Sequence, residues 1–96
     1  MEARFLYVTA PNADEARKIG EALVQERLVA CANVLGPISS IYWWQGQVQR
    51  DTEAVLIAKT RADLVERTVA RVKALHSYTV PCVVSLAIEQ GNPDFL

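Results

Sequence analysis

The sequence predicts a small α+β domain in the order strand, helix, strand, strand, helix, strand. Four short apolar runs are typical of strands, and two segments carry apolar residues at helical spacing. Turn residues, including glycine and proline, separate these segments. We expect a single domain over residues 1–96, because this length leaves no room for a linker and a second core. An apolar fraction of 51% is sufficient for one core.

The first strand and the first helix are predicted from the segment before residue 28. Residues 5–8 form an apolar run that ends at the Thr-Ala-Pro-Asn break. Asn12 is a favourable N-cap, and Glu15 three residues later completes a capping pair, so a helix is expected over residues 13–27. The apolar positions of its buried face are Ala16, Ile19, Leu23 and Val24.

A long hairpin is predicted next. Residues 31–44 resemble one strand bent at Gly36-Pro37, because proline cannot donate a hydrogen bond to a neighbouring strand. Gln45-Gly46 supplies the turn, and residues 48–59 return as the third strand.

The second helix and the last strand complete the order. Thr60 and Asp63 form a second candidate capping pair, and a helix is expected over residues 61–76. Its apolar face is predicted at Val65, Val69, Val72 and His76. A final strand is expected over residues 82–88, with residues 94–96 as the stub of a further helix.

This order is the split βαβ, or ferredoxin-like, arrangement. Right-handed crossovers place both helices on one face of a four-stranded sheet, which we expect to be antiparallel or mixed. The strand segments 5–8, 54–58 and 83–88 are apolar on both faces, and two helices cover only one. Exposing several large side chains would forfeit about 1.5–3 kcal/mol each. We therefore expect subunit association to cover the open face, with the hairpin contributing strands to a neighbour.

Several short segments carry a family resemblance, and together they span nearly the whole chain. They are Thr9-Ala10-Pro11, Ala30-Cys31-Ala32-Asn33-Val34, Ser40-Ile41-Tyr42-x-Trp44-x-Gly46, Lys59-Thr60, His76-x-Tyr78 and Gly91-Asn92. In this order and at these separations the chain resembles the divalent-cation tolerance (CutA) family. The resemblance implies a tight homotrimer of ferredoxin-like subunits, similar in architecture to the PII signalling proteins. It also implies a role in tolerance of copper and other divalent cations.

Three side chains are candidate metal ligands: Cys31, His76 and Cys82. Thiolate and imidazole suit copper or zinc, so copper or another divalent cation is the expected ligand. His76 and Cys82 flank the connection between the second helix and the last strand and can approach each other. The alternative is structural, because cysteine often packs as a small apolar side chain and His76 shares a helix face with valines.

The resemblance supports only part of this donor set. Where copper ligands have been proposed in the family, Val8 and Leu75 stand here in place of a cysteine and of one member of a histidine pair. Only His76 carries over. The chain also has Ser77 where the family usually has proline, and Cys82 where glutamate is usual.

A second candidate site comprises Tyr42, Trp44, Lys59 and Tyr78, in a cleft expected between subunits. Adjacent strand residues point to opposite faces, so Trp43 and Trp44 cannot share one pocket. Trimer packing is the alternative role for one of them. Lys59 lies beside the start of the second helix and is the best-placed cation for an anionic ligand, or else a solvated partner of a carboxylate.

Other function classes find little support. Ten basic and eleven acidic residues give a net charge of −1, which argues against nucleic-acid or membrane-surface partners. No catalytic motif occurs, and the single histidine has no evident orienting group, so we expect no enzyme. The start does not resemble a signal peptide, so a cytoplasmic protein with reduced thiols is expected.

Two hypotheses follow. The first is a homotrimeric copper-binding tolerance protein. The second is a PII-like adaptor that binds a small anionic ligand or a protein partner in its cleft.

Overall fold

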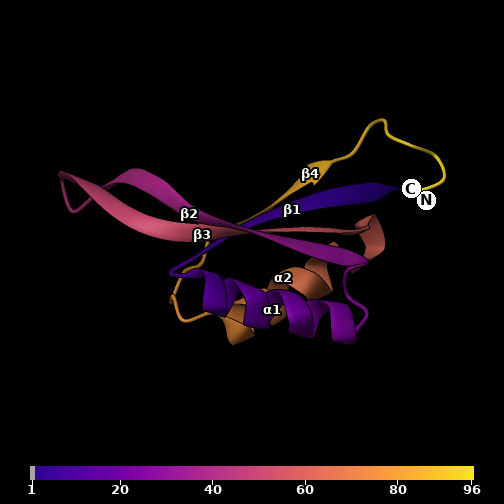
Figure 1. The fold of residues 1–96 in the computed structure, drawn as a ribbon, viewed down its shortest axis with the longest axis horizontal. Helices are drawn as coiled ribbons and strands as arrows, with labels where there is room; N and C mark the ends of the chain where they lie inside the picture. Colours follow the sequence, from indigo (N-terminus) through magenta and orange to yellow (C-terminus); the bar gives the residue numbers. More distant parts are fainter. Residues whose placement is uncertain (1) are drawn as a thin grey trace.

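The computed structural model describes residues 2–96 and shows a four-stranded sheet with two helices against one face (Figure 1). The elements in chain order are β1 (Ala3–Ala10), α1 (Ala13–Gln25), β2 (Cys31–Trp44), β3 (Gln47–Arg61), a short 3₁₀ segment η1 (Ala62–Leu64), α2 (Val65–Leu75) and β4 (Val83–Ala87). The predicted α+β class and the predicted element order are confirmed. No helix within residues 2–96 is both long and apolar enough to cross a membrane.

The strands lie in the order β2-β3-β1-β4, and each pair of neighbours is antiparallel. The expectation of a mixed sheet is therefore wrong for the described part of the chain. Each helical connection joins two strands that are not neighbours, because β3 lies between β1 and β2, and β1 lies between β3 and β4. As a result, no two neighbouring strands of the described sheet are parallel.

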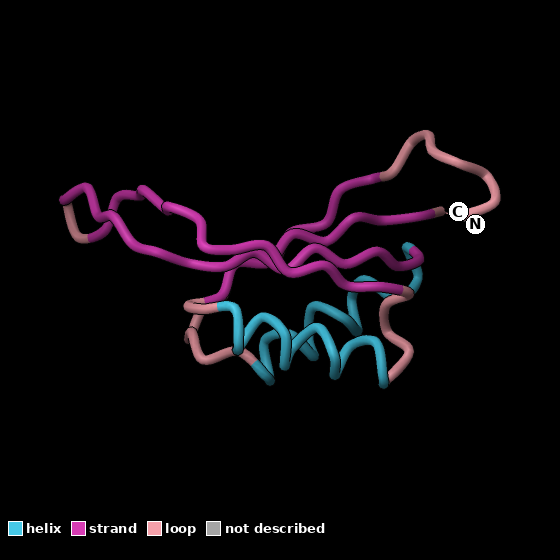
Figure 2. Tube along the Cα trace, viewed as in Figure 1, coloured by secondary structure: helices cyan, strands magenta, loops and turns pink. Residues whose placement is uncertain are grey.

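The β2–β3 hairpin extends well beyond the helices, as Figure 2 shows. The register shifts between Leu35 and Ile38, so the predicted bend at Gly36-Pro37 is confirmed. At the tip, Gln45 and Gly46 have φ values of 51° and 78°. Two successive residues with positive φ match the twist of a tight hairpin, which explains the glycine at the second position.

Two helix ends differ from the prediction. α1 stops at Gln25, two residues early, because Arg27 adopts a left-handed conformation with φ of 61°. The predicted cap by Thr60 and Asp63 is wrong. Thr60 belongs to β3, where its hydroxyl donates to the carbonyl oxygen of Leu28 at 2.6 Å, and the chain enters α2 through η1 without a side-chain cap. Asp63 instead pairs with Arg61 at 3.1 Å.

The last segment is also shorter than predicted. β4 covers only Val83–Ala87. The buried face of α2 also differs from the prediction, because Thr68 and Val72 are buried and Val69 is not. The stub expected at residues 94–96 is a single turn in which the amides of Phe95 and Leu96 both donate to the carbonyl oxygen of Asn92.

The helices bury one face of the sheet and leave the other open (Figure 1). Leu6, Val8, Leu56 and Ala58 point towards the helices and are almost completely buried. The register pairs Phe5 with Leu86 and Tyr7 with Val84 on the opposite face. Leu86 and Val84 remain 52% and 49% exposed there. The sheet thus has the uncovered apolar face that the sequence predicts, which we call the open face.

The Asn12 cap provides a test of the α1 start. Its side-chain oxygen accepts from the amide of Glu15 at 2.8 Å. We expect Asn12→Ala to lower the free energy of unfolding by about 1 kcal/mol in urea titrations, because this amide loses its partner. Asn12→Asp, which retains an acceptor, serves as the control and should stay close to the unmodified chain. Equal stability of all three chains would contradict the cap.

Candidate functional site

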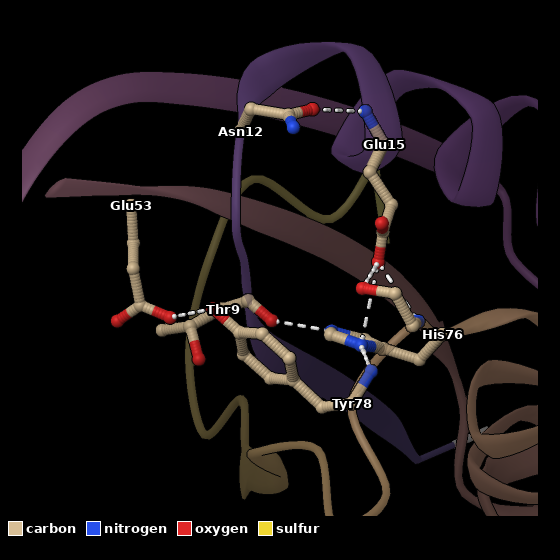
Figure 3. A network of polar contacts seen from close by, with 7 residues as sticks. Thr9, Asn12, Glu15, Glu53, His76 and Tyr78 are labelled. Atoms are coloured by element: carbon tan, nitrogen blue, oxygen red, sulfur yellow. Dashed lines mark hydrogen bonds and ion pairs between the residues drawn. The ribbon is translucent and has the colours of Figure 1, made fainter. Parts of the chain in front are cut away.

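His76 lies at the centre of a polar network where the end of β1, the start of α1 and the end of α2 meet (Figure 3). The residue is 8% exposed. Its Nε2 lies 2.7 Å from the carbonyl oxygen of Thr9, and its Nδ1 lies 3.0 Å from the amide of Tyr78. A carbonyl can only accept and an amide can only donate, so these contacts select the neutral ring with its proton on Nε2.

Glu15 connects α1 to the loop after α2 (Figure 3). Its Oε2 accepts from the amide and the hydroxyl of Ser77, at 3.0 and 2.9 Å, and lies 3.4 Å from Nδ1 of His76. Burial alone would raise the pKa of this carboxyl, but the hydrogen bonds from the amide and the hydroxyl of Ser77, together with the nearby charge of Lys18, outweigh it and lower the pKa. Glu15 does not complete the predicted capping pair, because its carboxylate is held by Ser77.

Tyr78 joins this network to the hairpin. Its backbone amide binds His76, the two rings are 4.7 Å apart, and its hydroxyl donates to Oε2 of Glu53 on β3 at 2.8 Å. Burial, the hydrogen bond to Glu53 and the nearby negative charges raise the pKa of Tyr78 well above its ordinary value. The phenol is therefore neutral and acts as a donor at any physiological pH.

A groove of about 660 Å³ lies beside Tyr78, which we call the hairpin groove. Its lining residues are Tyr42, Trp44, Glu53, Ser77, Tyr78, Thr79 and Val80. The hydroxyl of Tyr42 donates a hydrogen bond to Asp51, and this bond is the main cause of the raised pKa of Tyr42. The structure thus gathers three of the four predicted ligand-binding residues at one place.

Sequence reasoning missed the two carboxylates of this region. Glu53 and Asp51 lie at alternate positions of β3, so they share a face of the strand. That alternation is visible in the sequence, but their approach to Tyr78 and Tyr42 depends on contacts between distant segments.

Lys59, the fourth predicted residue, is not part of the hairpin groove. It lies six positions after Glu53 on β3, which is about 20 Å along the strand. Its Nζ lies 3.3 Å from Oδ1 of Asn33 and 3.9 Å from Sγ of Cys31. With Cys31 and Phe95 it lines a smaller pocket of about 180 Å³.

The three candidate metal ligands do not meet within one chain. Cys31 lies opposite Lys59 of β3, and Lys59 lies opposite Phe5 of β1. His76 and the backbone of Cys82 both contact Thr9, which is about 13 Å further along β1 than Phe5. Both thiols are unpaired, and that of Cys82 is exposed. Residues 2–96 hold no cluster of three or more His, Cys, Asp or Glu side chains able to bind a metal. A site using all three donors would have to form between subunits.

Comparison with known proteins gives consistent matches over nearly the whole chain. A family model described as CutA1 divalent ion tolerance protein matches residues 4–96. The divalent-cation tolerance protein CutA of Archaeoglobus fulgidus is 42% identical over 92 residues, covering 96% of this chain and 89% of the relative. The chloroplastic protein CutA 1 of rice is 43% identical over 91 residues, which are 95% of this chain. The chain spans about half of that rice protein, 51% of its length.

The fold matches as closely as the sequence. The crystal structure of CutA1 from Oryza sativa superimposes with a TM-score of 0.97 at 41% identity. This match covers 100% of the present chain and 88% of the rice chain.

The Glu15 carboxyl predicts a specific pH dependence. A carboxyl whose pKa is lowered by folding stabilises the folded chain above its ordinary pKa, here 4.5, and this contribution is lost as the pH falls through the lower folded value. We expect the unfolding free energy of Glu15→Gln to fall less than that of the unmodified chain between neutral pH and about pH 3, measured in urea. Glu21→Gln on the exposed side of α1 is the control. An identical loss in Glu15→Gln and the unmodified chain would contradict this assignment.

Proposed function

The chain belongs to the CutA1 divalent ion tolerance family, and on this premise we propose that it is a self-associating, non-catalytic protein that binds a divalent cation. The open face is the observation that carries the proposal. A subunit with exposed apolar side chains across one sheet face is stabilised by burying them against other copies of itself.

We propose the homotrimer of ferredoxin-like subunits as the assembly. The strand order β2-β3-β1-β4 with both helices on one face supports this fold type. The projecting hairpin supports the assembly, because Ile41 and Trp43, which share a face of β2, are 66% and 73% exposed at its tip. Side chains this large and apolar are typical of contacts with another subunit.

Copper is the cation we propose, as cargo held between subunits by thiolates. The two thiols are unpaired and cannot reach each other within one chain, so a shared site requires a neighbour. His76 joins as a third donor only if it gives up its hydrogen bond to Thr9 or to Tyr78. The soft donor character of thiolate favours copper over magnesium or calcium.

The arrangement of nucleophiles supports a non-catalytic role. The hydroxyl of Ser77 donates to Glu15, and Cys31 lies at the other end of the sheet from His76. Within residues 2–96, the ring of His76 forms its hydrogen bonds with the backbone of Thr9 and Tyr78 and not with a thiol or hydroxyl nucleophile. General-base activation needs such a contact. We propose the cytoplasm as the compartment, since both thiols are unpaired.

A second candidate function is that of a PII-like adaptor, with the hairpin groove as its ligand site. The observation that favours it is the convergence of Tyr42, Trp44 and Tyr78 on one cavity. Aromatic walls with a few polar groups are typical of small-molecule sites.

Association through the open face is tested by Leu86→Glu. This substitution places a charge where an apolar contact between subunits is proposed, so the oligomer should dissociate to monomers in sedimentation-velocity measurements. The control is Ala87→Glu, on the opposite face of the same strand beside Arg4. An intact oligomer in Leu86→Glu would contradict the role of this face, as would a monomeric unmodified chain.

Metal binding is tested by native mass spectrometry of the reduced protein, titrated with copper(I) and then with zinc(II). We expect saturable uptake of one ion per subunit, because each subunit supplies the same donors, and loss of uptake in Cys31→Ser and in Cys82→Ser. Uptake that survives both substitutions would contradict the thiolate site. A trimer without stoichiometric uptake would contradict the copper proposal and leave the assembly in place.

A further inference from the structure

We infer that the hairpin groove is a binding site for a small organic ammonium ion. This inference rests on the second candidate function, in which the groove is the ligand site, and it reverses the charge of the expected ligand. It requires neither a metal nor the thiols.

The charge around the groove is negative. Glu53 lines it, and Asp51 lies two positions away on the same face of β3. None of the lining residues is lysine, arginine or histidine. Arg50 belongs to the opposite face of β3, where it pairs with Ile41. An anion placed here would face two carboxylates without a compensating cation, which costs free energy in a partly desolvated site.

The phenols fix the carboxylates without neutralising them. Tyr78 donates to Oε2 of Glu53, and Tyr42 donates to Asp51. Each bond uses one of the roughly four acceptor positions of a carboxylate. The remaining positions can accept from an N–H donor, and a charged donor gives the strongest bonds of this kind. The raised pKa values of both phenols are consistent with this negative field.

The aromatic side chains supply a second attraction for the same ligand. Tyr42, Trp44 and Tyr78 line one cavity. A cation over such a ring is attracted by the negative charge of the ring face. Rings and carboxylates together suit an ion with an apolar body and a positive nitrogen. A compact inorganic ion uses the carboxylates alone.

Tyr78 is held rigidly enough to serve as one wall. Its amide binds the buried His76 ring, which is itself bonded to the carbonyl oxygen of Thr9 (Figure 3). The neighbouring Ser77 is held by Glu15 through two hydrogen bonds. A wall that is ordered before the ligand arrives reduces the entropic cost of binding.

The test uses three four-carbon probes that differ mainly in charge: butylammonium, butanol and butyrate. The host is the assembled protein with Trp43→Phe, which leaves Trp44 as the only tryptophan, because the chain has two. Trp44 fluorescence then reports on the groove. We expect saturable binding of butylammonium, at least about tenfold weaker binding of butanol, and no binding of butyrate.

Glu53→Gln removes the charge and preserves an acceptor for Tyr78. It should weaken butylammonium binding by about tenfold, while Glu89→Gln, outside the groove, should not change it. Saturable binding of butyrate instead would overturn the ammonium assignment and keep the groove as a ligand site. Absence of binding by all three probes would overturn both. Zinc(II) or magnesium(II) that displaces butylammonium and loses affinity in Glu53→Gln would show a divalent-cation site and overturn the inference.

Discussion

The position of β1 in the sheet is the constraint on which the rest of the structure depends. It pairs with β3 on one side and with β4 on the other, so its register decides which side chains of all three strands face the helices. A shift of one residue would move Leu6 and Val8 out of the core and place Phe5 and Tyr7 in it. The same register leaves the open face apolar, so the need for a partner surface follows from the pairing that builds the core. The end of β1 also presents the carbonyl oxygen of Thr9 to His76.

From Thr9 a continuous set of contacts leads to the hairpin. Nδ1 of His76 accepts a hydrogen bond from the amide of Tyr78 only in the tautomer that the bond to Thr9 selects. The phenol of Tyr78 in turn donates a hydrogen bond to Glu53. One side chain therefore connects the buried end of the sheet to the wall of the groove. This use of His76 is structural, and it competes with metal ligation, because a metal must take a ring nitrogen that already has a partner. The Glu15–Ser77 contact holds the same loop from the other side, and Ser77 can provide it because a serine has the amide and hydroxyl donors that proline lacks.

Sequence reasoning succeeded where the determining contact is local. The Asn12 cap lies within three residues of its partner, and the Gln45-Gly46 turn depends on the φ values of its own residues. The capping pattern gave a wrong prediction at Thr60, because its hydroxyl donates a hydrogen bond to the carbonyl oxygen of Leu28, which is distant in sequence. The candidate sites show this limit again. Tyr42, Trp44 and Tyr78 line one groove within a single chain, whereas their predicted cleft lies between subunits. Lys59 and Cys31 lie elsewhere, because the strand register, which composition does not reveal, separates them from this groove.

The chemistry of the groove separates two kinds of cation that one negative field would attract. Magnesium and calcium are bound by six or more oxygen ligands, and magnesium in particular sheds its water reluctantly. The hairpin groove is lined by the carboxylate of Glu53, with that of Asp51 close by, each already accepting from a phenol, and three of its other lining residues are aromatic. Such walls cannot replace the hydration of a small dication. An organic ammonium ion is more weakly hydrated, and its apolar body gains by leaving water, so the aromatic area that is useless to magnesium contributes directly to its binding. Aromatic rings beside paired carboxylates therefore favour the organic cation, and the soft thiolates favour copper at a separate place in the assembly.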